Sequence, residues 1–219
     1  MEKLRDLMVQ KGLDHLIVPA PENMFYLTGY DGWAFYLHQC IIVSRTTEHV
    51  LWIGRGSDLS VATACGVIGE GNAFAYPDTH LHSNKLHPYD YVAQIMATRG
   101  LSSGVLGVAM DAYHFTPAAY LALVKALSEC RVVSDDLIVN WQRVVKSSDE
   151  HMLMQEAARI GAAALLAGVS AIEAGSPISA TASEILRYQT GAPTKSDGGY
   201  PAIMPLLIDG VGPARPHDT

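Results

Sequence analysis

The sequence predicts an α/β fold, with a mixed sheet flanked by helices, followed by an α+β unit. Short apolar runs typical of strands alternate with helical patterns over residues 1–137. Two β-rich runs stand only three residues apart, which indicates a hairpin and therefore a mixed sheet. After residue 137 the alternation ends and a long helical pattern follows, so a second unit is predicted over residues 138–219.

Each element of the first unit is predicted from its own pattern. An amphipathic helix over residues 2–12 is ended by Gly12, and a short apolar strand over 15–18 is ended by Pro19. The later elements are, in order, a short helix over 22–27 closed by Gly29, hairpin strands over 39–44 and 48–54, a helix over 57–66, a strand over 73–76, a helix over 89–98, a strand over 105–110, a helix over 117–128 with Thr116 as N-cap, and a strand over 131–133.

The second unit opens with a long helix. Ser147 or Ser148 can cap it, and acidic residues follow in its first turn, where negative charge suits the helix dipole. Residues 161–172 are apolar on nearly every side of this helix, so it needs cover on every side. A helix over 180–189 and a strand-like run over 202–208 follow. No partner strand comes after that run, so we expect the unit to be incomplete.

Composition excludes several classes of protein. Of the 219 residues, 49% are apolar and 17% charged, which excludes a disordered or fibrous chain. A net charge of −7 argues against a nucleic-acid partner. Three distant cysteines fit a reducing compartment. The N-terminus is charged, and the most apolar stretch, 161–174, is too short to span a bilayer. We therefore expect a cytoplasmic protein with no membrane partner.

Two segments carry a resemblance to a known family. The first, residues 23–39, includes the run Gly-Tyr-Asp-Gly-Trp-Ala-Phe-Tyr-Leu-His-Gln. The second, residues 143–150, reads Arg-Val-Val-Lys-Ser-Ser-Asp-Glu and opens the long helix. Together they resemble the creatinase/prolidase family of pita-bread hydrolases, and the first looks most like its ectoine-hydrolase branch. The resemblance implies a creatinase-type N-terminal domain over 1–137 and a truncated pita-bread catalytic unit over 138–219.

Aromatic side chains crowd residues 30–39, a predicted loop that we call the aromatic loop. Because exposing aromatic side chains is costly, Trp33 and Phe35 either plug a core or an interface or line a site, and composition leaves both open. The resemblance implies that the loop reaches across a homodimer to the partner's active site. There Asp31, Trp33, Phe35 and His38 would bind a small-molecule substrate.

His217 lies in a Gly/Pro-rich tail, where a lone histidine is usually just solvated. The resemblance places an active-site histidine after the first catalytic-domain strand and its glycine-rich loop. Residues 202–208, Gly210, Gly212 and His217 follow that order. The resemblance therefore implies that His217 is catalytic, as a general acid/base in creatinase-like members or as a substrate contact in metallopeptidase members.

His80, His82 and His87 form the histidine cluster of the sequence. Two histidines two residues apart can chelate a metal, but the segment is polar and proline-rich, so a solvated loop is the better interpretation. The resemblance places the family's metal ligands beyond Thr219. No metal ligand is assigned in this chain, and the cofactor stays open between two divalent metal ions and none.

The leading hypothesis for function is hydrolysis of a non-peptide C–N bond in a small nitrogenous solute, as in ectoine hydrolase or creatinase. One alternative is a metal-dependent Xaa-Pro dipeptidase or aminopeptidase. Another is a non-catalytic N-terminal fragment that binds or dimerises. Because the ligand-bearing half of the site is expected beyond Thr219, we expect the 219-residue chain alone to be inactive.

Overall fold

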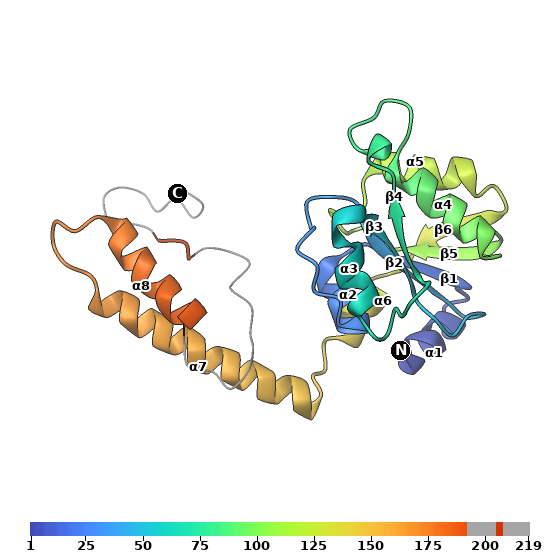
Figure 1. Ribbon diagram of the computed structural model, residues 1–219. Helices are drawn as coiled ribbons and strands as arrows, with labels where there is room; N and C mark the ends of the chain where they lie inside the picture. The colour runs from blue at the N-terminus through green and yellow to red at the C-terminus, as the bar shows by residue number, and fades with distance from the viewer. Residues whose placement is uncertain (192–204, 208–219) are drawn as a thin grey trace. The chain divides into compact units, whose positions relative to one another are not determined.

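The computed structural model describes residues 1–191 and 205–207 (Figure 1). The chain divides into two compact units, the first ending at Val145 and the second beginning at Lys146. The predicted α/β class is confirmed by the first unit, a mixed sheet covered by helices.

The sheet of the first unit has six strands in the order β4-β3-β2-β1-β5-β6. Every strand runs in the same direction except β2, which pairs antiparallel with β1 and β3. The carboxyl ends of the other five strands therefore lie at one edge of the sheet, where β2 begins. The strands are β1 (His15–Val18), β2 (Cys40–Ser44), β3 (Leu51–Arg55), β4 (Ala73–Tyr76), β5 (Gly104–Val108) and β6 (Cys130–Ser134).

Successive strand residues point to opposite faces of the sheet, and apolar side chains occupy both faces. Helices therefore cover both faces. Ile17 and Ile42 belong to one core and their neighbours Leu16 and Ile41 to the other. The first core lies under α4 (Pro88–Thr98) and α5 (Pro117–Ala126), and the second lies under α1 (Glu2–Gln10), α2 (Pro21–Thr28), α3 (Leu59–Ala64) and α6 (Ile138–Gln142) (Figure 1).

Helix α6 extends the first unit past the predicted boundary at residue 137. Ile138 and Val139 are 2% and 1% exposed and belong to the second core. Leu137 adopts a left-handed conformation before the helix, with φ of 59°. The buried Asp135 carboxylate supports this turn by accepting a hydrogen bond from the Leu137 N–H at 3.0 Å. The boundary at 137 stays a prediction, while the compact unit described here ends at Val145.

The second unit contains α7 (Ser148–Ser170) and α8 (Ile178–Gly191). The predicted cap of α7 is confirmed: Ser147 Oγ accepts a hydrogen bond from Glu150 N at 3.2 Å, and the Glu150 carboxylate accepts one from Ser147 N at 2.8 Å. The two helices pack closely at Gly168, where a Cβ atom would lie 2.6 Å from the Ile185 side chain. A larger residue at this crossing would require the Ile185 side chain to move.

Helix α7 corrects one sequence-based statement. By length and composition alone it could cross a membrane, with a mean hydropathy of 1.2 over 18 residues. The expectation that no stretch is long and apolar enough is therefore wrong for this helix. The finding is weak evidence for a membrane span, because single apolar helices outside membranes also pass this test.

The predicted strands of the first unit are present with small shifts of their ends. Two elements were not predicted, namely α6 and the 3₁₀ turn η2 (Asp78–His80). The helix predicted over 57–66 is a 3₁₀ turn, η1 (Gly56–Asp58), followed by α3. The strand predicted over 202–208 lies largely outside the described residues, and its described part, 205–207, has no regular secondary structure. His217 also lies outside the described residues.

Candidate functional site

The aromatic loop joins α2 to β2 and is closed at its base by buried side chains. Tyr30 Oη donates a hydrogen bond to Gln39 Oε1 at 2.9 Å, and both residues are buried. Tyr76 of β4 donates a hydrogen bond to the His38 carbonyl oxygen at 2.7 Å. A Cβ at Gly32 would overlap the Tyr30 ring, so glycine lets the chain pass over that ring. These contacts hold the loop in a defined place.

The aromatic side chains of the loop lie outside the two cores. Trp33, Phe35 and Tyr36 are 54%, 41% and 63% exposed. Their rings meet edge to face, with centroids 5.2 to 6.1 Å apart. The alternative in which Trp33 and Phe35 plug the core is therefore excluded, and a site or an interface remains.

A pocket of about 500 Å³ opens beside the aromatic loop. It is lined by the end of that loop, by residues 80–83 and 86–88 after β4, and by residues 113, 114 and 116 near the start of α5. These segments lie at the edge of the sheet where the carboxyl ends of five strands gather, which is where ligands typically bind in α/β folds. The histidines that line the pocket are His38, His80, His82, His87 and His114.

Two of these histidines lie against each other at the N-terminus of α4, with their ring planes tilted by 54°. The ring centroids of His38 and His87 are 4.7 Å apart, and both rings also contact Tyr89. His87 is the N-cap of α4, because its Nδ1 accepts a hydrogen bond from Tyr89 N at 3.1 Å. Burial lowers the pKa of His38 and of His87, and the neighbouring His38 ring lowers the pKa of His87 further. Both imidazoles are therefore neutral at pH 7.

His114 is unusual because both of its ring nitrogens are buried and have no hydrogen-bond partner within the described residues. The Tyr113 ring stacks against it with centroids 3.8 Å apart. Burial lowers the pKa of His114, although nearby Glu22 raises it. Unpaired buried polar atoms are uncommon in folded proteins, so this corner of the pocket is a candidate position for binding.

The predicted site residues fall at different places around this pocket. Phe35 and His38 line it. Trp33 reaches it only through its edge contact with Phe35, and Asp31 is exposed and is not one of the lining residues. Whether these side chains bind substrate stays a prediction.

The 80–87 segment is not simply a solvated loop, since its histidines form one wall of the pocket. No group of three or more metal-ligating side chains is arranged to hold a metal in the described part of the chain. Sequence reasoning missed Tyr113 and His114. Their position shortly after the strand predicted over 105–110 was the available signal, because ligand sites gather at the carboxyl ends of strands.

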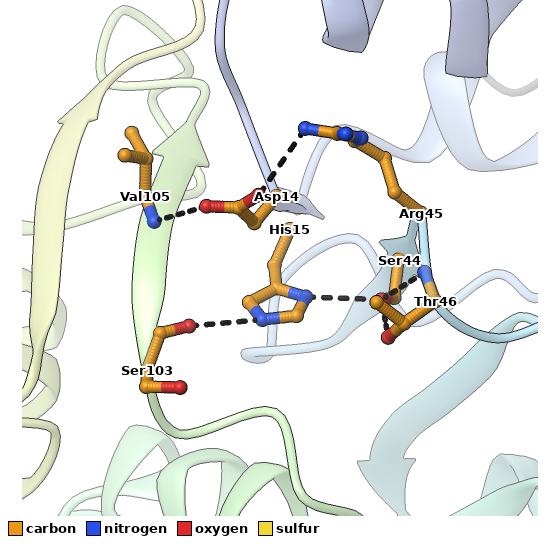
Figure 2. Close-up of polar contacts among 7 residues, drawn as sticks. All are labelled: Asp14, His15, Ser44, Arg45, Thr46, Ser103 and Val105. Carbon is orange, nitrogen blue, oxygen red and sulfur yellow. Dashed lines mark hydrogen bonds and ion pairs between the residues drawn. The ribbon is translucent and has the colours of Figure 1, made fainter.

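A buried serine–histidine pair lies at the other edge of the sheet (Figure 2). His15 Nε2 donates a hydrogen bond to the Ser103 carbonyl oxygen at 3.1 Å, so Nδ1 accepts one from Ser44 Oγ at 3.0 Å. Thr46 donates to the same Oγ from its N–H and its hydroxyl. His15 is 4% exposed, and burial lowers its pKa. With every polar atom paired and no accessible face, the pair is structural and not a nucleophile with its base.

The carboxylate of Asp14 extends this network to the neighbouring strand. It accepts a hydrogen bond from Val105 N at 2.9 Å and forms an ion pair with Arg45 at 3.2 Å (Figure 2). Together with His15, it ties the starts of β1 and β5 to the end of β2.

Comparison with known proteins places the chain in a family. The fold is a mixed α/β domain, and a family model described as the creatinase/prolidase N-terminal domain matches residues 1–145. The chain belongs to the creatinase/prolidase family.

Two relatives match nearly the whole chain. Ectoine hydrolase from Halomonas elongata is 39% identical over 223 residues, which cover 99% of this chain and 56% of the relative. An uncharacterized hydrolase/peptidase, y4tM, from Sinorhizobium fredii is 32% identical over 205 residues, which cover 94% of this chain and 52% of the relative. The chain thus spans about half the length of these relatives.

Solved structures share the fold. The prolidase from Pyrococcus horikoshii OT3 matches with a TM-score of 0.64 and 15% identity, over 85% of this chain and 47% of the prolidase. The Xaa-Pro dipeptidase from Bacillus anthracis matches with a TM-score of 0.63 and 21% identity, over 85% of this chain and 47% of the dipeptidase.

Proposed function

We propose that this chain provides the N-terminal part of a hydrolase that cleaves a non-peptide C–N bond in a small nitrogenous solute related to ectoine. The observation that carries the proposal is the 39% identity to ectoine hydrolase over 99% of the chain. That match extends beyond residue 145 into α7 and α8, so it is not limited to the N-terminal domain.

The aromatic loop supports this choice of substrate class. Trp33, Phe35 and Tyr36 present exposed ring faces and edges beside a pocket with no lysine, arginine, aspartate or glutamate among its described lining residues. A planar cationic amidine, such as the ring of ectoine, can lie against aromatic faces. In this proposal the loop serves the active site of a second subunit in a homodimer, and His38 is its polar contact.

The rest of the active site is proposed to come from sequence that corresponds to the other half of the relatives. His217 of this chain would act beside it as the general acid/base, and a metal, if one is used, would be held by that other half. A single general acid/base contributes only about 100- to 10,000-fold to a rate. We therefore propose that the 219-residue chain alone lacks appreciable hydrolase activity.

A hybrid enzyme tests the proposal. Residues 1–219 replace the matching part of the Halomonas elongata ectoine hydrolase, and turnover of ectoine and of an Xaa-Pro dipeptide is measured. We expect the hybrid to hydrolyse ectoine, and we expect Trp33→Ala and His38→Ala to lower that activity at least about tenfold. Leu121→Ala, on the exposed face of α5, is the control and should leave it unchanged.

The outcomes separate the alternatives. Cleavage of the Xaa-Pro dipeptide in preference to ectoine would favour the peptidase function. Full activity in both loop variants would reject the substrate-lining role of the loop. Turnover of ectoine at an enzyme-like rate by the 219-residue chain alone would show that the site is complete without the other half.

A further inference from the structure

The histidines at the N-terminus of α4 have fixed and complementary hydrogen-bonding roles. His87 Nδ1 accepts a hydrogen bond from Tyr89 N, so the proton of the neutral ring sits on Nε2. In the described part of the chain Nε2 has no partner, and it is not a buried atom. Because His87 lines the pocket, its Nε2–H is an available donor there.

His38 supplies the other half of the pair. The ring of His38 lies near the backbone of His114, which favours the charged form of the ring. While the ring is neutral, one of its nitrogens carries the proton and the other is an acceptor, and this second nitrogen becomes a donor when the ring takes up a proton. With their centroids 4.7 Å apart, the two rings can offer two N–H donors to one ligand group once His38 is protonated.

The rest of the pocket restricts the chemistry of that ligand. Its described lining residues include no carboxylate that would repel an anion and no lysine or arginine that would bind one permanently. The side chains of Phe35, Tyr36 and Tyr113 supply flat apolar walls. A volume of about 500 Å³ suits a small organic molecule.

We propose that this pocket binds the carboxylate group of a small, flat organic molecule between His38 and His87. His87 donates from Nε2, and the second ring nitrogen of His38 takes up one proton from solvent as the carboxylate enters. This inference deepens the proposed function, because it names the group by which a substrate would be held. It rests on the proposed function only for the identity of that substrate.

The proton goes to His38 because His87 cannot accept one at Nδ1 without losing the cap of α4. The groups that face His87 are His38, His80 and Asp90, of which Asp90 favours its charged form. His38 is faced by His87 and Tyr89, and the Tyr76 hydroxyl is engaged with the His38 backbone. A bound carboxylate adds the opposite charge that raises the pKa of His38 from its lowered value.

Calorimetric titration of the 219-residue chain tests the site with benzoate and its neutral isostere benzamide. Measurements in buffers with different ionisation enthalpies give the number of protons taken up. We expect benzoate to bind with uptake of about one proton, and its affinity to rise by up to about tenfold per pH unit as the pH falls from 8 to 7. Benzamide should bind at least about tenfold more weakly.

Three variants sharpen the test. His38→Gln should abolish proton uptake, since an amide does not titrate. His87→Ser keeps a good helix cap but removes the ring donor, so it should weaken benzoate binding at least about tenfold. His49→Gln, at an exposed position in the turn between β2 and β3, is the control and should change neither quantity.

Each outcome bears on a separate claim. Equal binding of benzoate and benzamide, or proton uptake that survives His38→Gln, would overturn the carboxylate site. Inorganic phosphate that competes as well as benzoate would replace it with a general anion site. If benzoate binds and ectoine does not, the carboxylate site stands and the proposed substrate falls. If the hybrid enzyme hydrolyses ectoine equally well with His87→Ser, the proposed function stands and this inference falls.

Discussion

At the scale of residues, the same side-chain type serves quite different purposes in this chain. His15 is fully paired and holds three strands together. His87 has one nitrogen committed to a helix cap, and its other nitrogen, at a pocket, has no partner among the residues that the structure describes. Trp52 is buried in the second core, and Trp33 is half exposed on the aromatic loop. The chemistry available to each residue follows from its partners and not from its type.

Trp33→Ala should lower the free energy of unfolding of the chain by less than about 1 kcal/mol, because its exposed ring gains only edge contacts with two neighbours. Trp52→Ala is the matched control, since Trp52 is completely buried, and it should cost about 3–5 kcal/mol. Urea unfolding followed by circular dichroism measures both. Equal losses in the two variants would mean that Trp33 is a structural residue.

The buried histidines should make the chain less stable in mild acid. Burial lowers the pKa of His15 below its ordinary value of 6.5, so below pH 6.5 the unfolded chain binds more protons than the folded one. The free energy of unfolding should therefore fall as the pH drops from 6.5 toward the pKa of the folded state, by up to about 1.4 kcal/mol per pH unit for each such histidine.

His15→Gln should remove the contribution of one histidine from the pH dependence of the free energy of unfolding. The contributions of His38, His87 and His114 should remain, because burial lowers their pKa values too. His49→Gln, at an exposed position, is the control for the substitution itself. Urea unfolding at a series of pH values between 5 and 8 provides the measurement. If His15→Gln does not change the pH dependence of the free energy of unfolding, the hydrogen bond between Ser44 and His15 breaks before the chain unfolds.

At the scale of elements, the sequence predicts what depends on neighbouring residues and misses what depends on distant ones. The strand over 15–18 was predictable because its residues form one short apolar run, and all four are buried. The cap at Ser147 was predictable from a four-residue spacing. Helix α6 has only five residues, too few for a helical period, so no pattern could reveal it.

The candidate site shows the same division. The crowding of aromatic residues around Trp33 marked one wall of the pocket from sequence alone. The meeting of His38 with His87 could not be predicted, because the two are brought together by the loop before β2 and the segment before α4. The Tyr30–Gln39 hydrogen bond that closes the loop likewise exists only once the sheet has formed.

Helix α7 should cause the chain to self-associate. Leu165 and Val169, one turn apart, are 63% and 57% exposed, and covering each side chain is worth about 1.5–3 kcal/mol. The double variant Leu165→Glu with Val169→Glu should shift the chain toward monomer and reduce binding of the dye ANS, as measured by sedimentation velocity and fluorescence. Gln155→Glu, an exposed polar position on the same helix, is the control. A wild-type chain that is monomeric and does not bind ANS at high concentration would contradict this prediction.

At the scale of the whole molecule, the two units differ in how they are stabilised. The first has a core on each face of its sheet, closed by helices on both sides. In its described part, the second has two helices that meet at Gly168, with much of the apolar surface of α7 exposed. The first unit therefore has the closed cores that a domain needs to fold by itself. Whether this folding unit includes α6 decides where it ends.

A chain that ends at Val145 should be more stable than one that ends at Leu137. The shorter chain lacks Ile138 and Val139, both buried in the second core, and burying two such side chains is worth about 3–6 kcal/mol. It also lacks Asn140, whose side-chain oxygen accepts a hydrogen bond from Asn23 of α2 at 2.8 Å. Thermal unfolding of the two chains, followed by circular dichroism, should show a lower midpoint and stronger ANS binding for the shorter one. Equal midpoints would place the boundary of the folding unit at 137, where the sequence pattern changes, and would make α6 a mere extension of it.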